Sequence, residues 1–174
     1  LNYSNFSLDA AVINFSHQKT NSINQTTAIK KYEKFLQSTS LKMKKAGSPY
    51  HYHSIGSTIT CKADTYASVG GMSKKKATED FYFLESVAKY KSVYIIKDIL
   101  VYPSSRISER VYLGTGYRMK QSEDGYDIDK LYFDNNSFKI LQKWLELGTM
   151  GYRSSIQEIL KSANNIDPKL SSFL

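Results

Sequence analysis

The chain has 174 residues, of which 41% are hydrophobic, 13% aromatic and 23% charged, and its net charge at pH 7 is +8. This length suffices for one domain with a hydrophobic core and is too short for two independent domains. Cys61 is the only cysteine, which excludes an internal disulfide and a cysteine zinc site, and no apolar run has the roughly 18 residues of a membrane span. We therefore expect a cytoplasmic protein without stable membrane insertion, whose positive charge favours an anionic partner.

The first half of the chain alternates between strand and helix patterns. Residues 9–15 form a short apolar run that predicts a buried strand. Apolar residues spaced three and four apart then predict a helix from residue 26 or 27 to about 45. Residues 56–63, in which β-branched and small polar residues alternate, predict a second strand, and a short helix over 64–69 is ended by two glycines.

Two further strands and several helices are predicted in the second half. Thr78 has the residue type of a helix N-cap, and the apolar stripe behind it predicts a helix over 79–90. Residues 92–97 and 99–103 predict two short strands. The stretch 104–125 lacks a clear period and is expected to be an ordered loop, a type of segment that often carries function. The remaining predicted elements are helices near 136–147 and 153–163.

Glu79 and Asp80 stand in the first turn of the helix behind Thr78, where two explanations apply. Free N–H groups and the helix dipole favour carboxylates at a helix start, so the pair can be explained without any function. A carboxylate held rigidly at a helix start beside a glycine turn can also act as a general base toward a hydroxyl, and the cap at Thr78 would fix Asp80 for that role. The short motif alone favours the first explanation.

Arginines and glycines in the predicted loop are candidate phosphate ligands. Arg106 and Arg110 alternate with Ser108 on an extended segment, before a Gly-Thr-Gly sequence that contains Thr115. Arginines together with backbone N–H groups of a glycine turn can cradle a phosphate. A purely structural pair of arginines explains the pattern equally well.

Two pairs of possible metal ligands have simpler explanations. His51 and His53 would share one face of an extended segment, but no third ligand is evident nearby, so we interpret them as polar pocket residues. Asp127 and Asp129 form an Asp-x-Asp sequence, which can hold a divalent cation on a sugar nucleotide. A solvated acidic turn is the better interpretation of so short a motif.

Three motifs follow one another between about residues 45 and 117. They are Gly56-Ser57, Val69-Gly70-Gly71 and Glu79-Asp80, in a strand, in a turn after a short helix, and at the head of a helix. In this order they resemble the second half of the catalytic domain of bacterial family 2 glycosyltransferases of the GT-A type. The resemblance implies a helix-rich α/β fold with a partial GT-A sheet, as in nucleotide-diphospho-sugar transferases, flanked by helices and truncated at its N-terminal side.

The resemblance also implies a role for each matched position in an inverting sugar transfer. Asp80 would be the general base that removes the proton of the acceptor hydroxyl as this hydroxyl attacks the anomeric carbon. The acceptor-binding candidates are Glu79, Gly70, Gly71, His53 and Ser57. The phosphate-binding candidates, which are not part of the family pattern, are Arg106, Arg110 and Thr115.

The chain also departs from the family. Family members begin with a strand-rich nucleotide-binding half that ends in an Asp-x-Asp metal motif, whereas only 68 residues precede Val69 here and contain no such motif. Asp127 and Asp129 follow the Glu-Asp pair, so the metal role is not transferred to them. We expect this chain, which begins at Leu1, to be an acceptor-side fragment of a longer enzyme, and such a fragment need not be active in isolation. The Mg or Mn ion of the parent enzyme would bind outside this chain.

We therefore predict that residues 1–120 form the acceptor-side half of a GT-A domain and that residues 121–174 form a helical C-terminal extension packed on it. The partners would be a nucleotide sugar and a sugar or lipid-linked hydroxyl acceptor, without nucleic acid. One alternative is a basic module that binds nucleic acid or phosphate through tyrosine stacking and lysine clusters. The other is a helical protein-interaction domain in which Glu79 and Asp80 only cap a helix.

Overall fold

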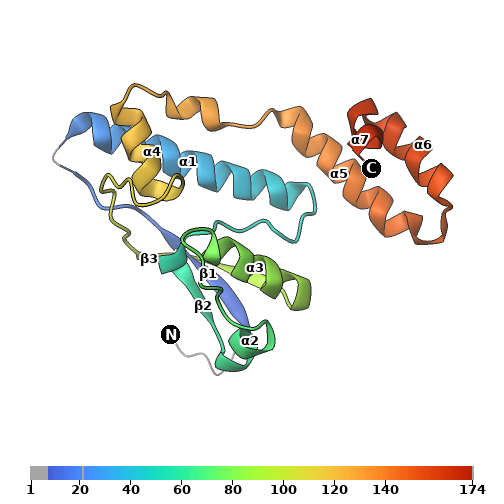
Figure 1. Ribbon diagram of the computed structural model, residues 1–174, viewed down its shortest axis with the longest axis horizontal. Coiled ribbons are helices and arrows are strands. Elements are labelled where there is room, and N and C mark those ends of the chain that lie inside the picture. Colours follow the sequence, from blue (N-terminus) through green and yellow to red (C-terminus); the bar gives the residue numbers. More distant parts are fainter. Residues whose placement is uncertain (1–7, 21, 174) are drawn as a thin grey trace.

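The computed structural model describes residues 8–20 and 22–173 and shows a small sheet with helices packed around it (Figure 1). The strands are β1 (Ala10–Phe15), β2 (Ile59–Cys61) and β3 (Val93–Val101). The helices are α1 (Ile23–Lys45), α2 (Ala63–Ser68), α3 (Glu79–Tyr90), α4 (Gly114–Glu123), α5 (Asn135–Met150), α6 (Ile156–Ile166) and α7 (Pro168–Phe173). Single 3-10 turns are η2 (Gly56–Thr58), η3 (Ile128–Leu131) and η4 (Gly151–Arg153). The predicted helix-rich α/β class is confirmed at this level.

Strand β1 lies in the centre of the sheet, whose order is β2-β1-β3. It pairs antiparallel with β2 and parallel with β3, so the sheet is mixed. The register with β3 slips on either side of Asn14, whose side-chain amide donates a hydrogen bond of 3.1 Å to the Lys97 carbonyl. The two strands predicted over 92–97 and 99–103 are therefore one strand. That prediction was wrong because the polar residues between the two apolar runs mark an irregularity in strand pairing and not the end of a strand.

One hydrophobic cluster joins α3 to the sheet. Ala10 and Val12 of β1 pack with Phe83, Leu84 and Val87 of α3, and the last two are completely buried. Burial of each large apolar side chain contributes roughly 1.5–3 kcal/mol. This packing fixes α3 against β1 and so fixes where the Glu-Asp pair at its start lies.

A second cluster joins α4 to α1. Ala28, Ile29 and Tyr32 of α1 surround Met119 of α4 and Ile128 of η3, and both of these are almost fully buried. The cluster holds the first turn of α4 near the carboxyl ends of β1 and β3. Segments more than 80 residues apart in the sequence thereby meet at one end of the sheet (Figure 1).

Several predicted boundaries were wrong for local reasons. Helix α4 was not predicted, and its residues were expected to belong to a loop. Its glycines suggest a turn, and Met119 is its only buried side chain. The strand predicted over 56–63 is shorter, since η2 takes its first residues and only three pair in β2. Helix α1 begins at Ile23, before the predicted start, because the Ser22 side chain caps its first turn.

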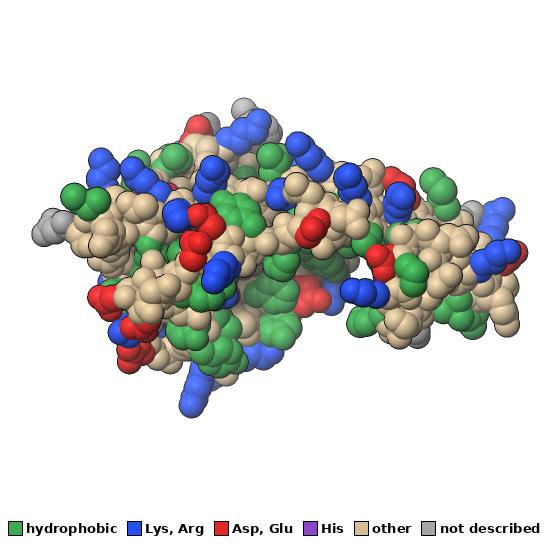
Figure 2. Space-filling view, turned by 90° about the horizontal axis from the view of Figure 1, so that it is seen from above, with side chains coloured by type: hydrophobic (Ala, Val, Ile, Leu, Met, Phe, Trp, Pro, Cys, Tyr) green, Lys and Arg blue, Asp and Glu red, His purple; other side chains and the backbone are tan. Residues whose placement is uncertain are grey.

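The helices α5, α6 and α7 form an arm that extends to one side of the body (Figures 1 and 2). The helices predicted near 136–147 and 153–163 are confirmed with shifted bounds, and α7 was not predicted. Helix α6 begins with a capping box in which Ser155 and Glu158 bond each other's backbone N–H groups. The first seven residues of the predicted unit 1–120 lie outside the described residues.

Candidate active site

The start of α3 and the segment 104–117 face each other across a cleft of about 280 Å³. One wall consists of residues 76–80. The other consists of side chains that alternate along 104–110 and of the first turn of α4. The predicted general base and all the predicted phosphate ligands therefore border the same space. These residues are Asp80, Arg106, Arg110 and Thr115.

Asp80 is half-buried and is held by a backbone N–H group. Its Oδ1 atom accepts a hydrogen bond of 2.7 Å from the Phe81 N–H, and Gly56 lies beside the carboxyl group. Burial raises the pKa of Asp80, the bond from Phe81 lowers it, and the charge of Glu79 raises it, with a net rise. A carboxylate with a raised pKa takes up a proton more readily, which suits a general base.

Thr78 precedes α3, as predicted, but its side chain does not cap the helix. The residue has a left-handed backbone with φ of 69°, and its hydroxyl donates to the Ala77 carbonyl. A capping side chain normally reaches the first free N–H groups from an extended backbone, so the predicted mechanism for fixing Asp80 was wrong. A β-branched residue in this conformation is strained by about 1–2 kcal/mol, and such strain is common at functional sites.

Hydrogen bonds hold the opposite wall against the body. The Pro103 carbonyl accepts from the Gln18 N–H at 2.9 Å, and the Ser105 hydroxyl donates to the Gln18 carbonyl at 2.7 Å. Further along, the Ser108 N–H donates to the Gly116 carbonyl at 3.2 Å. The predicted ordered loop is therefore confirmed for the part of it that precedes α4.

The wall formed by 104–117 carries unpaired positive charge. Arg106 and Arg110 are exposed, and among the residues that the structure describes neither forms an ion pair. Beside them α4 begins at Gly114, where φ of 82° turns the chain into the helix. The N–H groups of its first turn have no partner within the helix. Together with Lys76 on the other wall, these groups give the cleft a chemistry suited to an anion.

His53 does not border the cleft. Its ring is buried, its Nε2 atom lies 3.1 Å from the Ile13 carbonyl oxygen, and its ring centroid lies 4.8 Å from that of Phe15. Burial lowers the pKa of His53. Together with His51 it borders a separate groove between α1 and β3, which fits the interpretation as polar pocket residues. Acceptor binding by His53 in the cleft is not supported.

Three other acceptor-binding candidates also lie outside the lining of the cleft. Ser57 is exposed in η2, and Gly70 and Gly71 form a left-handed turn after α2 with φ of 77° and 71°. Glu79, by contrast, does line the cleft. Gly56 was not predicted as a site residue, but it lies beside Asp80, since a Cβ atom added there would be in ordinary van der Waals contact with Oδ2 of Asp80 at 3.7 Å. The glycine before Ser57 is thus the part of that motif that lies next to the candidate base.

The two carboxylates of the Asp-x-Asp sequence form ion pairs with a lysine of α1. Lys31 Nζ lies 2.6 Å from Oδ2 of Asp129 and 3.5 Å from Oδ1 of Asp127, and Asp127 also accepts from the Asp129 N–H at the start of η3. Across residues 8–20 and 22–173, no three His, Cys, Asp or Glu side chains form a group that could hold a metal. The described residues thus offer no ligand set for the divalent cation that the resemblance implies.

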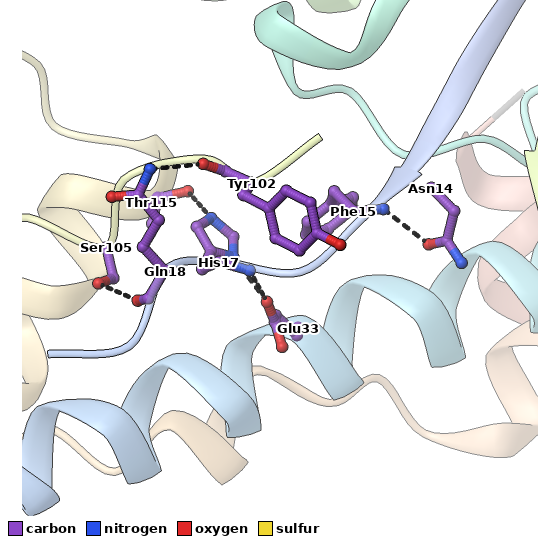
Figure 3. Close-up of polar contacts among 8 residues, drawn as sticks. All are labelled: Asn14, Phe15, His17, Gln18, Glu33, Tyr102, Ser105 and Thr115. Atoms are coloured by element: carbon purple, nitrogen blue, oxygen red, sulfur yellow. Dashed lines mark hydrogen bonds and ion pairs between the residues drawn. The ribbon is translucent and has the colours of Figure 1, made fainter. Parts of the chain in front are cut away.

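His17 and Glu33 are functional candidates that the sequence did not reveal. His17 Nε2 lies 3.2 Å from the hydroxyl oxygen of Thr115, and Nδ1 lies 3.0 Å from Oε1 of Glu33 (Figure 3). The imidazole is completely buried. No spacing motif could indicate these contacts, because His17 and Thr115 are 98 residues apart.

Comparisons with protein-family models, with curated proteins and with solved structures found no match to the chain. In the part of the chain that the structure describes, no helix has both the length and the apolar character needed to cross a membrane.

Proposed function

We propose that this chain supplies the acceptor side of a sugar-transfer site in which Asp80 is the general base. The observation that carries the proposal is the shared cleft, with a carboxyl group of raised pKa on one wall and, on the other, two arginines that form no ion pair within the described residues. A base and a positively charged surface are what hydroxyl attack on a diphosphate-activated sugar requires. The resemblance of the motif order to family 2 glycosyltransferases supplies the reaction class.

In the proposed reaction the acceptor hydroxyl gives its proton to the carboxylate of Asp80 while its oxygen bonds to the anomeric carbon of the donor. The bond between that carbon and the diphosphate oxygen breaks, and its electron pair leaves with the diphosphate. Attack opposite the leaving group inverts the anomeric configuration. Arg106, Arg110 and Lys76 would stabilise the charge that develops on the diphosphate.

The proposal assigns the remaining parts of the site to a longer protein. The nucleotide-binding half and the divalent cation would belong to that protein, and no step here depends on a residue of this chain binding the ion. Within this chain, Glu79 is the remaining acceptor-binding candidate on the wall that carries Asp80.

The test is sugar transfer by the longer protein with Asp80 or the arginine pair replaced. D80N should reduce transfer by about a hundredfold or more while the fold is retained, because the acceptor proton then has no base to receive it. Replacement of Arg106 and Arg110 by Ala should raise the KM for donor or acceptor. Unchanged kinetics in both variants would refute the proposal.

A basic module that binds nucleic acid or phosphate is the second candidate. Lys75 Nζ lies 3.6 Å from the ring centroid of Tyr82, and Tyr112 near the cleft is 78% exposed. Exposed aromatic and basic side chains are typical of single-strand binding. On the face in Figure 2, however, Lys and Arg side chains are spread out and mixed with Asp and Glu. Nucleic-acid binding that weakens steeply with salt would favour this candidate.

A further inference from the structure

His17 is a buried residue that contacts Thr115, one of the residues that line the cleft. It lies two residues after the end of β1, its ring packs edge-on against Phe15 with centroids 5.3 Å apart, and its side chain has no exposed surface. One ring nitrogen faces Glu33 on α1, and the other faces Thr115 in the first turn of α4 (Figure 3). Thr115 also borders the cleft. Glu33, His17 and Thr115 therefore form a chain of three polar groups that ends at the ligand space.

The positions of the protons in this chain follow from the available donors. Oε1 of Glu33 accepts from the backbone N–H of His17, which can only donate, and the same oxygen lies 3.0 Å from Nδ1. Since Oε1 already accepts from the backbone N–H, we infer that it accepts from Nδ1 as well, which places a proton on Nδ1. Burial lowers the pKa of His17, which favours the neutral ring. Nε2 is then left without a proton and can only accept.

The donor to Nε2 is the hydroxyl of Thr115, at 3.2 Å. A threonine hydroxyl has one proton, and with an unprotonated Nε2 beside it this proton is directed at the buried ring of His17. The lone pairs of the same oxygen remain available to the ligand space. Thr115 can therefore accept a hydrogen bond from a ligand but cannot donate one, and its side chain would repel the oxygens of a phosphate.

We propose that Thr115, oriented by His17 and Glu33, is a specificity-determining residue that accepts a hydrogen bond from a sugar hydroxyl in the cleft. The sugar part of this assignment rests on the proposed function, whereas the direction of the hydrogen bond does not. Phosphate binding by the Thr115 side chain, expected from the sequence, is replaced by this role. Arg106, Arg110 and the backbone N–H groups at the start of α4 remain as the anion ligands.

The direction of the hydrogen bond is tested by nitrogen NMR of the 174-residue chain. The chain has only three histidines, so a His17→Gln variant assigns the signals. His17 should be neutral, with a proton on Nδ1 and none on Nε2. The hydrogen bond to Nε2 should be lost in T115V and restored in T115S. A proton on Nε2, or an Nε2 signal that does not respond to T115V, would overturn the assignment.

The ligand is tested with two kinds of probe, the methyl glycosides of common hexoses and inorganic pyrophosphate. Loss of one neutral hydrogen bond in T115V should weaken glycoside binding by up to roughly tenfold. T115S should restore it, and pyrophosphate affinity should stay within about twofold. T149V on α5 is the matched control and should change neither affinity, because in the part of the chain that the structure describes Thr149 bonds only within its own helix, to the Glu146 carbonyl.

The outcomes separate the inference from the function on which it rests. Equal weakening of glycoside and pyrophosphate binding in T115V would make Thr115 an anion ligand and overturn the inference. Unchanged glycoside binding would overturn it as well, with the proposed function intact. If no glycoside binds even the unaltered chain, the sugar assignment of Thr115 fails together with the acceptor site, while NMR alone still decides the direction of the hydrogen bond.

Discussion

Replacement of Gly116 by Ala tests how the arginine-bearing wall is held. A Cβ atom at this position would lie 2.5 Å from Cβ of Ser108, 3.1 Å from its backbone N and 3.2 Å from its Cα. No rotation of a side chain relieves such contacts, so the segment that carries Arg106 and Arg110 must move away from α4. Overpacking of this kind costs about 1–3 kcal/mol. The gain in helix propensity from Gly to Ala is only about 0.5–1 kcal/mol.

The matched control is Gly148→Ala in α5, where an added Cβ atom has nothing within 4 Å. The same substitution should therefore stabilise the chain by about 0.5–1 kcal/mol at Gly148 and destabilise it by up to about 2 kcal/mol at Gly116. Urea denaturation measures both changes, and pyrophosphate titration reports whether the arginines have moved. Equal stability of the two variants, with unchanged pyrophosphate affinity in G116A, would refute the reasoning.

Three further predictions concern charge. The raised pKa of Asp80 means that the folded state favours the protonated carboxyl, so D80N should raise the free energy of unfolding at neutral pH, and this gain should shrink toward about pH 4. The R106A/R110A double variant should bind pyrophosphate at least about tenfold more weakly, whereas K139A/K143A on α5, with the same loss of charge, should not. Burial lowers the pKa of His17 and His53, so these two side chains take up protons at a higher pH in the unfolded chain than in the folded chain. The free energy of unfolding should fall as the pH drops below about 6.5, and less steeply in H53Q. Denaturation at several pH values checks the first and third predictions.

Local chemistry made part of the site predictable. The start of α3 was predictable because an acidic pair directly precedes an apolar stripe, and this helix positions Asp80. The alternation of Arg106, Ser108 and Arg110 correctly indicated side chains on one side of an extended segment, and these three residues line one wall of the cleft. What spacing could not show is that this wall faces Asp80, since that depends on how α3 and α4 pack.

The remaining features depend on contacts that are distant in the sequence. Helix α4 is stabilised by the packing of Met119 on α1 rather than by its own pattern, so its glycines suggested a turn. His53 was predicted in the site, yet its ring completes the interior next to Phe15. The hydrogen bond between His17 and Thr115 forms only once β1 and α4 are side by side. No local pattern encodes these three features.

The central claim, that Asp80 is the base of a sugar-transfer site, is tested most directly by nucleoside diphosphate release in the longer protein, screened with a panel of nucleotide sugars. D80N should lower kcat by about a hundredfold to ten-thousandfold, because general base catalysis contributes on that order. E79Q, one residue away in the same helix turn, should change KM more than kcat. Turnover by D80N within threefold of the unaltered protein would contradict the account.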